Sequence, residues 1–151
     1  MLNEDYNDML RCLAAENVKF MLVGAFALAV HGYPRATMDM DVWVMPSPEN
    51  AEAVIRALGR FGAPLHSISN ADLQRDDTLF QIGVAPRRID IITGATGLVF
   101  EETYARSESV DVDGLTIRVP SVDDLIINKT ASGRLKDLAD VEVLKQRRPK
   151  G

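Results

Sequence analysis

The sequence predicts an α+β fold, an α/β sandwich in which helices flank a mixed β-sheet. Apolar residues recur every three or four positions in some segments and every second position in others. A few short segments are continuously apolar, as buried strands are. These segments follow one another as helix, strand, helix, strand, helix, then strands, then helices, an order that is typical of two-layered mixed folds.

The first half of the chain alternates between helices and strands. Tyr6, Met9, Leu10, Leu13 and Ala14 have helical spacing, which predicts an amphipathic helix over residues 4–16. The apolar run 20–23 predicts a buried strand, and residues 25–31 predict a short helix that ends at Gly32 and Pro34. Residues 38–44 alternate like a two-faced strand, and Pro48 is expected in the first turn of the next helix.

The second half is expected to begin with two neighbouring strands. Residues 78–84 and 88–92 fit these strands, and residues 94–107 are expected to be helical. The Asp113-Gly114 pair within residues 110–117 predicts a hairpin turn. Ser121 is expected to cap a helix, and the apolar residues between Leu135 and Leu144 predict the last one.

Length and composition predict one soluble domain over residues 1–151. No apolar run approaches the roughly 20 residues that span a membrane, and the N-terminus lacks the basic start of a secretory signal. Cys12 stands alone, so neither a disulfide framework nor a cysteine metal cluster is expected. We therefore expect a cytoplasmic protein without membrane contact. The net charge of −5 argues against a broad nucleic-acid-binding surface.

Asp39 and Asp41 are the most informative pair of residues. Side chains two apart on a strand project from the same face, and two neighbouring carboxylates repel one another unless a cation lies between them. Magnesium prefers a few carboxylates and takes its other ligands from water and phosphates. The alternative is a solvated edge strand that binds no metal. Trp43 is expected in the core, on the strand face opposite Asp41.

Asp90 is a second unusual acid, since it lies in the apolar strand 88–92. If that strand lies beside residues 38–44, Asp90 completes a three-aspartate metal site. Two metal ions can then act on the attacking hydroxyl and on the triphosphate. Asp90 is the residue best suited to accept the hydroxyl proton, or to bind the metal that activates the hydroxyl. The alternative is that Asp90 pairs with Arg87 or Arg88.

Gly24 and Ala25 join a predicted strand to a predicted helix. Two small residues there let the backbone approach a phosphate, which the free N–H groups of the helix N-terminus attract. Gly-Ala alone is a weak signal, and a close packing contact explains it equally well. Its interest lies in its position, thirteen residues before the aspartate pair.

Together these motifs resemble the DNA polymerase beta-type nucleotidyltransferase superfamily. Val23-Gly24-Ala25, thirteen further residues and Asp39-Met40-Asp41-Val42 match its signature, except that Ala25 replaces the usual Gly or Ser. The string 31–41 and the segment 128–140 are similar to small bacterial nucleotidyltransferases related to the toxin of abortive-infection systems.

The resemblance implies a mixed-sheet nucleotidyltransferase fold and Mg²⁺ held by Asp39, Asp41 and Asp90. It also implies that Gly24 and Ala25 lie against the triphosphate, assisted by Thr37 and Lys129. Asp137 is expected to orient Lys129 or Arg134 rather than to bind metal.

The leading hypothesis is an enzyme that moves a nucleoside monophosphate from a nucleoside triphosphate to an acceptor hydroxyl and releases pyrophosphate. The acceptor is a small molecule, a tRNA end or a protein, and the resemblance suggests a place in a toxin–antitoxin or abortive-infection system. A homodimer or a partner subunit would complete so small a site. The alternative is an inactive binding or regulatory module, which the Ala25 substitution favours. Metal-dependent hydrolysis is disfavoured because no Ser or Thr follows the aspartate pair closely.

Overall fold

The computed structural model describes residues 2–33, 39–84 and 86–147. Its main sheet has four strands in the order β1-β2-β4-β3, formed by β1 (Phe20–Val23), β2 (Met40–Val44), β4 (Ile89–Ile92) and β3 (Leu79–Ile82). β2 runs antiparallel to β1 and parallel to β4, and β3 runs antiparallel to β4. The sheet is therefore mixed, as predicted, and β2 and β4 are its two inner strands.

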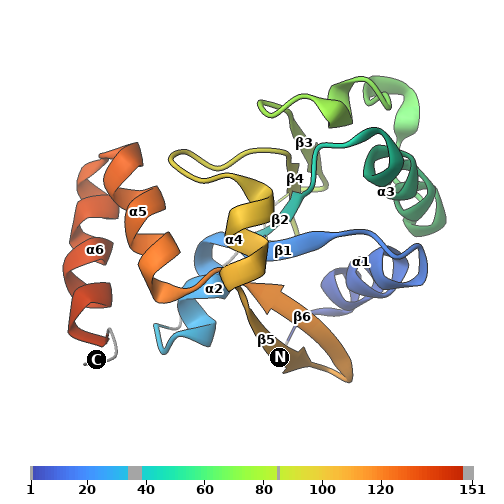
Figure 1. Ribbon diagram of the computed structural model, residues 1–151. Coiled ribbons are helices and arrows are strands. Elements are labelled where there is room, and N and C mark those ends of the chain that lie inside the picture. Colours follow the sequence, from blue (N-terminus) through green and yellow to red (C-terminus); the bar gives the residue numbers. More distant parts are fainter. Residues whose placement is uncertain (1, 34–38, 85, 148–151) are drawn as a thin grey trace.

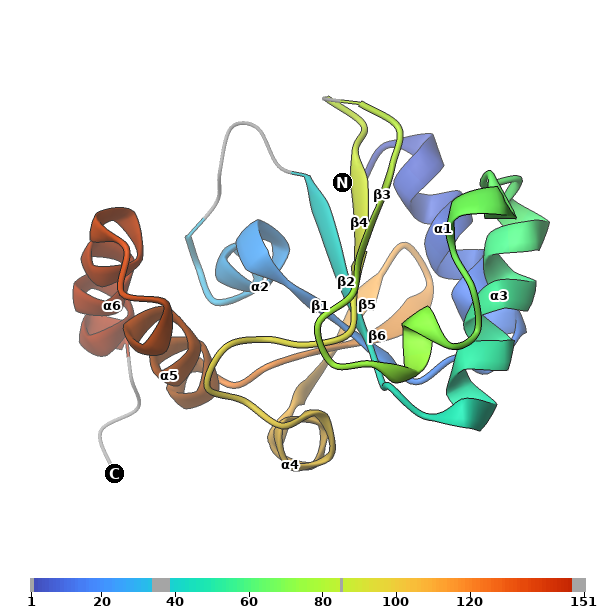
Figure 2. The same ribbon diagram turned by 90° about the horizontal axis from the view of Figure 1, so that it is seen from above.

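Two helices cover one face of this sheet. Figure 2 shows α1 (Glu4–Ala15) and α3 (Pro48–Phe61) side by side on the same side of the strands. Both begin as their sequences predict, because the side chains of Asn3 and Ser47 accept hydrogen bonds from backbone N–H groups of the first turn. Their apolar stripes pack against the alternate side chains Met40, Val42 and Val44 of β2 to form the main hydrophobic core.

Asn50 ties the start of α3 to the ends of the two strands beside it. Its side chain is buried, accepts a hydrogen bond from Lys19 N at 2.8 Å, and donates to Lys19 O and Met45 O at 3.0 and 2.9 Å. All three partners are backbone groups. The asparagine therefore fixes where the chain enters β1 and leaves β2.

The other face carries α2 (Gly24–Val30) and α4 (Phe100–Arg106). Trp43 lies on this face, with its ring edge-to-face against Phe100 at 5.2 Å between centroids. The tryptophan is buried, as predicted, but its predicted orientation is wrong. Positions 41 and 43 are two apart on a strand, so their side chains share one face.

The C-terminal part adds a hairpin and two helices. β5 (Glu108–Val112) and β6 (Leu115–Val119) form a separate antiparallel pair that turns at Asp113 and Gly114, both of which have positive φ. α5 (Val122–Ser132) begins at Ser121, whose Oγ accepts a hydrogen bond from Asp124 N, and α6 (Leu135–Arg147) folds back along it. Figure 1 shows these two helices together at the opposite end of the molecule from α1 and α3.

The main departure from the predicted elements lies between β4 and α4. Only Phe100–Arg106 of the predicted helix 94–107 is helical. Gly94 packs so closely on Asp76 that a Cβ would overlap the Asp76 carbonyl oxygen, and Gly97 has a φ of +82°. Glycine tolerates the close contact at position 94 and the positive φ at position 97, but neither fits an α-helix. The segment is therefore an irregular loop. Two short 3₁₀ turns that were not predicted, Leu65–Ser67 and Asp72–Gln74, lie between α3 and β3.

None of the helices within the described ranges is long and apolar enough to cross a membrane.

Candidate active site

The two inner strands bring two of the predicted aspartates together. In the parallel pairing of β2 with β4, Asp41 stands directly opposite Asp90. The parallel alignment also means that both strands begin at the same edge of the sheet. This is the arrangement that the three-aspartate prediction required.

Asp39 immediately precedes β2, and an arginine links it to Asp90. Arg88 Nη2 lies 2.8 Å from Asp39 Oδ2, and Arg88 Nε lies 3.3 Å from Asp90 Oδ1. Arg88 therefore bridges two of the three aspartates. The sequence had offered this pairing as an alternative to a metal site.

The fit between Arg88 and Asp90 is poor. Arg88 Nε and Asp90 Oδ1 are both buried, and neither has a hydrogen bond of good geometry despite their proximity. The other contact, from Arg88 Nη2 to Asp90 Oδ2, is long at 3.4 Å. Asp90 thus keeps a buried oxygen whose hydrogen-bonding capacity the protein does not use.

Asp41 shows how much negative charge is gathered here. Burial raises the pKa of its carboxyl group to about 6, and the charges of Asp90 and Asp39 add to the rise. Arg88 opposes this shift but does not cancel it. The cluster therefore carries more negative charge than its resident cation neutralises.

Gly24 has a packing role that the sequence left open. Its φ is +65°, and a Cβ at this position would overlap Asp41 Oδ2. The start of α2 therefore lies directly against the carboxylate of Asp41, and only glycine fits there. This close approach brings the backbone that precedes Ala25 to the same edge as the aspartates.

These residues line one side of a pocket of about 570 Å³. Gly24, Ala25 and Leu28 of α2 lie beside the aspartates and Arg88, and α5, α6 and their connection form the other side. The residues from that second side are Lys129, Arg134, Lys136, Asp137 and Asp140. The pocket therefore has an acidic side on the sheet and a side with three cations on the helices.

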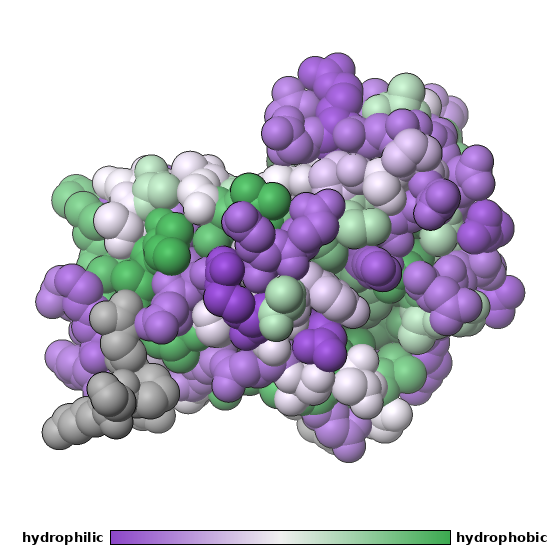
Figure 3. All heavy atoms as spheres, viewed as in Figure 1, coloured by the Kyte–Doolittle hydropathy of each residue, from purple (hydrophilic) through white to green (hydrophobic). Residues whose placement is uncertain are grey.

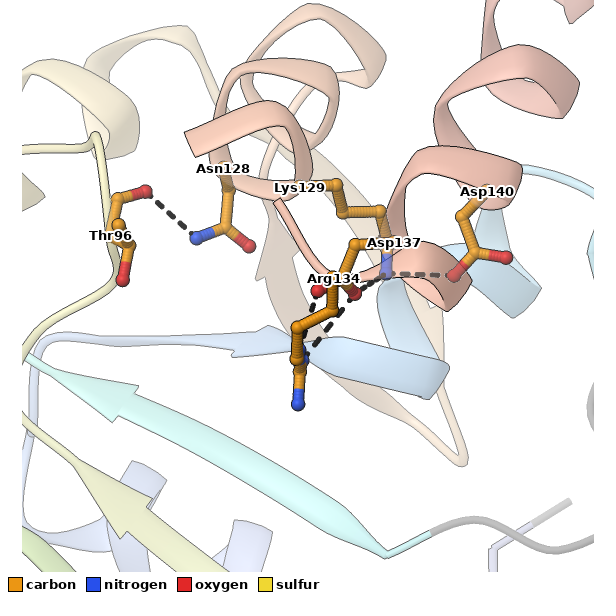
Figure 4. A network of polar contacts seen from close by, with 6 residues as sticks. All are labelled: Thr96, Asn128, Lys129, Arg134, Asp137 and Asp140. Atoms are coloured by element: carbon orange, nitrogen blue, oxygen red, sulfur yellow. Dashed lines mark hydrogen bonds and ion pairs between the residues drawn. The ribbon is translucent and has the colours of Figure 1, made fainter. Parts of the chain in front are cut away.

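The helical side is an ordered ion-pair network, which Figure 4 shows. The buried carboxylate of Asp137 accepts a hydrogen bond from Arg134 Nε at 2.6 Å and lies 3.5 Å from Lys129 Nζ. Lys129 also pairs with Asp140 at 2.9 Å. Burial alone would raise the pKa of Asp137, but Arg134 and Lys129 lower it below its ordinary value. Asp137 thus orients both cations, as the sequence suggested for one or the other.

Most of the predicted site residues meet at this pocket. Asp39, Asp41, Asp90, Gly24, Ala25 and Lys129 all line it, whereas Thr37 lies outside the described residues. Among the side chains that the structure describes, no group of three or more His, Cys, Asp or Glu is arranged to hold a metal ion. Metal binding and the individual residue roles therefore stay predictions.

Sequence reasoning did not assign site roles to Arg88, Lys136 or Asp140. Arg88 stands two residues before Asp90, so its position on the same strand face was a usable signal. Tyr6 of α1 was missed as well, and its hydroxyl group donates to the carbonyl oxygens of Arg88 and Pro86 at 3.0 and 3.2 Å. Tyr6 thus holds the chain where it enters β4, and no local pattern reveals a contact across 82 residues.

Solved structures share this fold. A protein of Thermotoga maritima described as a candidate nucleotidyltransferase matches 97% of this chain over 94% of its own, with a TM-score of 0.59 and 16% identity. The lincosamide antibiotic adenylyltransferase LnuA, solved with lincomycin, covers 97% of this chain with 98% of its own, at a TM-score of 0.61 and 13% identity. The antibiotic-resistance factor ANT(2'')-Ia covers 94% of this chain with 81% of its own, at a TM-score of 0.59 and 11% identity. No curated protein sequence matches the chain.

A family model described as "Nucleotidyltransferase of unknown function (DUF6036)" matches residues 2–145. The match spans both sides of the pocket, from α1 through most of α6. It confirms the prediction of a nucleotidyltransferase, whereas the resemblance to abortive-infection toxins stays a prediction. The three structures agree with the predicted mixed fold. The chain therefore belongs to this nucleotidyltransferase family.

Proposed function

We propose that the protein transfers a nucleoside monophosphate from a nucleoside triphosphate to an acceptor hydroxyl and releases pyrophosphate. One observation carries the proposal: within a nucleotidyltransferase family, Asp39, Asp41 and Asp90 on one side of the pocket face Lys129, Arg134 and Lys136 on the other. Arg88 lies among the three aspartates, and Asp137 and Asp140 pair with cations of the helical side. A metal–triphosphate complex has the complementary distribution, with its cation at one end and phosphate oxygens along its length.

The aspartates suit Mg²⁺ by their chemistry. Asp39, Asp41 and Asp90 offer carboxylate oxygens, the ligands that magnesium prefers. The unsatisfied buried oxygen of Asp90 and the raised pKa of Asp41 both indicate a place where additional positive charge would be stabilising. When bound, the cation would neutralise charge on the transferring phosphoryl group and make the acceptor hydroxyl more acidic.

The protein's own groups would orient the reactants. The backbone at Gly24 and Ala25 would lie along the phosphates, and Asp90 would accept the proton of the acceptor hydroxyl. Lys129, Arg134 and Lys136 face the pocket from the helical side and would stabilise the negative charge of the departing pyrophosphate. The Asp137 carboxylate holds Lys129 and Arg134 in position, so less ordering would be needed during the reaction.

The test is nucleotide transfer with each α-labelled triphosphate, Mg²⁺, and a cell extract divided into small molecules, tRNA and protein. We expect label in one fraction with the wild-type protein. Asp41→Asn should lower the rate at least about a thousandfold, because it removes a charge needed for phosphoryl transfer. Asp8→Asn, at an exposed α1 residue that pairs with Arg11, is the matched control and should stay active. Full activity of Asp41→Asn would contradict the proposal.

Arg88 favours the alternative function. If its guanidinium group held Asp39 and Asp90 at all times, no metal ion could bind, and the protein would be a binding or regulatory module. Isothermal titration with Mg²⁺ and each nucleoside triphosphate separates the two functions. Binding in the micromolar range supports the enzyme, whereas no binding at millimolar concentration supports the module.

The biological setting follows from the resemblance to abortive-infection nucleotidyltransferases. It supports a cytoplasmic role in a toxin–antitoxin or abortive-infection system. Induced expression in a bacterial host should then arrest growth, and Asp41→Asn should not. Growth arrest by both proteins would show that the effect is independent of transfer.

A second copy of the chain is the proposed partner. Figure 3 shows hydrophobic atoms gathered over the α5–α6 end of the molecule. The exposed large apolar residues of these two helices are Ile127, Leu135, Leu138 and Val143. Such a patch favours association. Leu135→Glu should shift a dimer to monomers in sedimentation, and a monomeric wild-type protein at high concentration would contradict the proposal.

A further inference from the structure

Arg88 is the one pocket residue whose position conflicts with the proposed metal site. Its guanidinium group contacts Asp39 and Asp90, two of the three proposed ligands. A permanent arginine there would exclude a metal ion, whereas a displaceable one would compete with it. The contacts of Arg88 distinguish these two cases.

The main chain of Arg88 is fixed. Its carbonyl oxygen accepts hydrogen bonds from Tyr6 Oη and from Met40 N, both at 3.0 Å. Tyr6 is buried in the core, and Met40 opens β2. Any movement of the positive charge must therefore come from the side chain alone.

The side chain is held much less firmly. It is 37% exposed, and only its contact with Asp39 Oδ2 is short, at 2.8 Å. Asp39 lies outside the strand and is itself 30% exposed, so this ion pair is open to solvent. The contacts with Asp90 are long and leave Arg88 Nε without a hydrogen bond. Rotation of the side chain would break one good ion pair and no well-formed network.

We infer that Arg88 is the resident counter-ion of the aspartate cluster, which a divalent cation displaces on binding, and that it thereby limits metal affinity. The inference rests on the proposed function, since it concerns the same three carboxylates. It accounts for the absence of a metal-holding arrangement among the described side chains, because Asp39 is engaged by the guanidinium.

The test measures Mn²⁺ binding in the absence of nucleotide, by the loss of the free Mn²⁺ electron paramagnetic resonance signal. Arg88→Met removes the charge and keeps an unbranched side chain, so Mn²⁺ should bind about tenfold more tightly than to the wild type, a change of about 1.4 kcal/mol. Arg88→Lys retains the charge but loses the planar, two-pronged guanidinium group, so its Mn²⁺ affinity should be intermediate. Arg87→Met is the matched control. Arg87 is adjacent and pairs with Asp5 outside the pocket, so its loss should leave Mn²⁺ affinity unchanged.

Thermal unfolding provides a second measurement. Without metal, Arg88→Met should melt below the wild type, because three carboxylates then face one another without a cation. Saturating Mn²⁺ should raise its melting temperature more than that of the wild type. If Arg88→Met is too unstable to purify, the intermediate affinity and larger Mn²⁺ response of Arg88→Lys carry the same test.

The outcomes separate this inference from the proposed function. Unchanged Mn²⁺ affinity in Arg88→Met and Arg88→Lys would overturn the inference, even if the wild-type protein transferred nucleotides. Tighter Mn²⁺ binding in a protein without transfer activity would support the inference and contradict the proposed function. The absence of Mn²⁺ binding in every variant would overturn the inference but not the proposed function, since the metal could still bind together with the phosphates of the nucleotide.

Discussion

Asp41→Asn is expected to stabilise the metal-free protein while it abolishes nucleotide transfer. Burial raises the pKa of Asp41 from 3.8 to about 6, and Asp90 and Asp39 add to the rise. The folded protein therefore holds a proton on Asp41 more tightly than the unfolded chain does. The stability associated with this proton is fully present below a pH of about 3.8 and is lost as the pH rises through about 6.

The magnitude follows from the size of the shift. A change of about 2 pKa units corresponds to about 3 kcal/mol. Because Asp41 lines an open pocket, solvent screening should reduce this loss to about 1–2 kcal/mol. For a chain of this length that is about 3–6 °C in melting temperature. Asparagine cannot ionise, so the variant should escape the loss.

The assay is thermal unfolding of both proteins in EDTA at pH 4, 5, 6 and 7.5. The melting temperature of Asp41→Asn relative to that of the wild type should rise between pH 4 and about 6 and then stay constant. Asp8→Asn controls for the loss of one exposed carboxylate. A difference that does not change with pH, or a variant less stable than the wild type at pH 7.5, would refute the reasoning.

Three further substitutions test the packing around the pocket. Gly24→Ala should lower the free energy of unfolding by about 1–2 kcal/mol because of the positive φ alone, and by more because its Cβ would overlap Asp41. The same variant should lose most of its transfer activity, and urea unfolding and the transfer assay measure the two effects. Asn50→Ala removes the side-chain partner of Lys19 N, Lys19 O and Met45 O, although Lys19 O keeps its hydrogen bond from Met45 N. The change should cost about 2–4 kcal/mol in urea unfolding, and a loss under 0.5 kcal/mol would contradict that role. Asp137→Asn should cost about 1–3 kcal/mol and weaken nucleotide binding in calorimetry, because Lys129 and Arg134 lose their shared buried carboxylate; unchanged affinity would show that neither cation contacts the nucleotide.

Much of the fold was predictable because the decisive signals are local. Period-two alternation located β2, and apolar spacing located α1. Pro48 located the start of α3, and Ser121 located that of α5. The loop before α4 was mispredicted because Gly94 and Gly97 serve contacts with Asp76 and with α5, which are distant in sequence. Local propensity cannot register such contacts.

The site was predictable in its acidic half and less so in its basic half. Two aspartates in apolar strands conflict with strand propensity, and that conflict points to function. Arg134 and Lys136 sit at a helix terminus and on an exposed helix face, where cations are ordinary. Arg134 and Lys136 differ from other surface cations only because α5 and α6 pack against the pocket. Arg88 was visible as a partner of Asp90, but its contact with Asp39 depends on the parallel pairing of β2 with β4.

The mixed strand order has a consequence for how this scaffold can diversify. The carboxylates stand on or beside inner strands, where a shift of one residue would send every side chain to the opposite layer. Insertions are therefore poorly tolerated at that edge. Among the described residues, no ladder of backbone hydrogen bonds joins α5 or α6 to a neighbouring strand, so the length, tilt and side chains of these helices can vary. We expect relatives to preserve the acidic edge and to differ in the helices opposite, where recognition of new acceptors would arise.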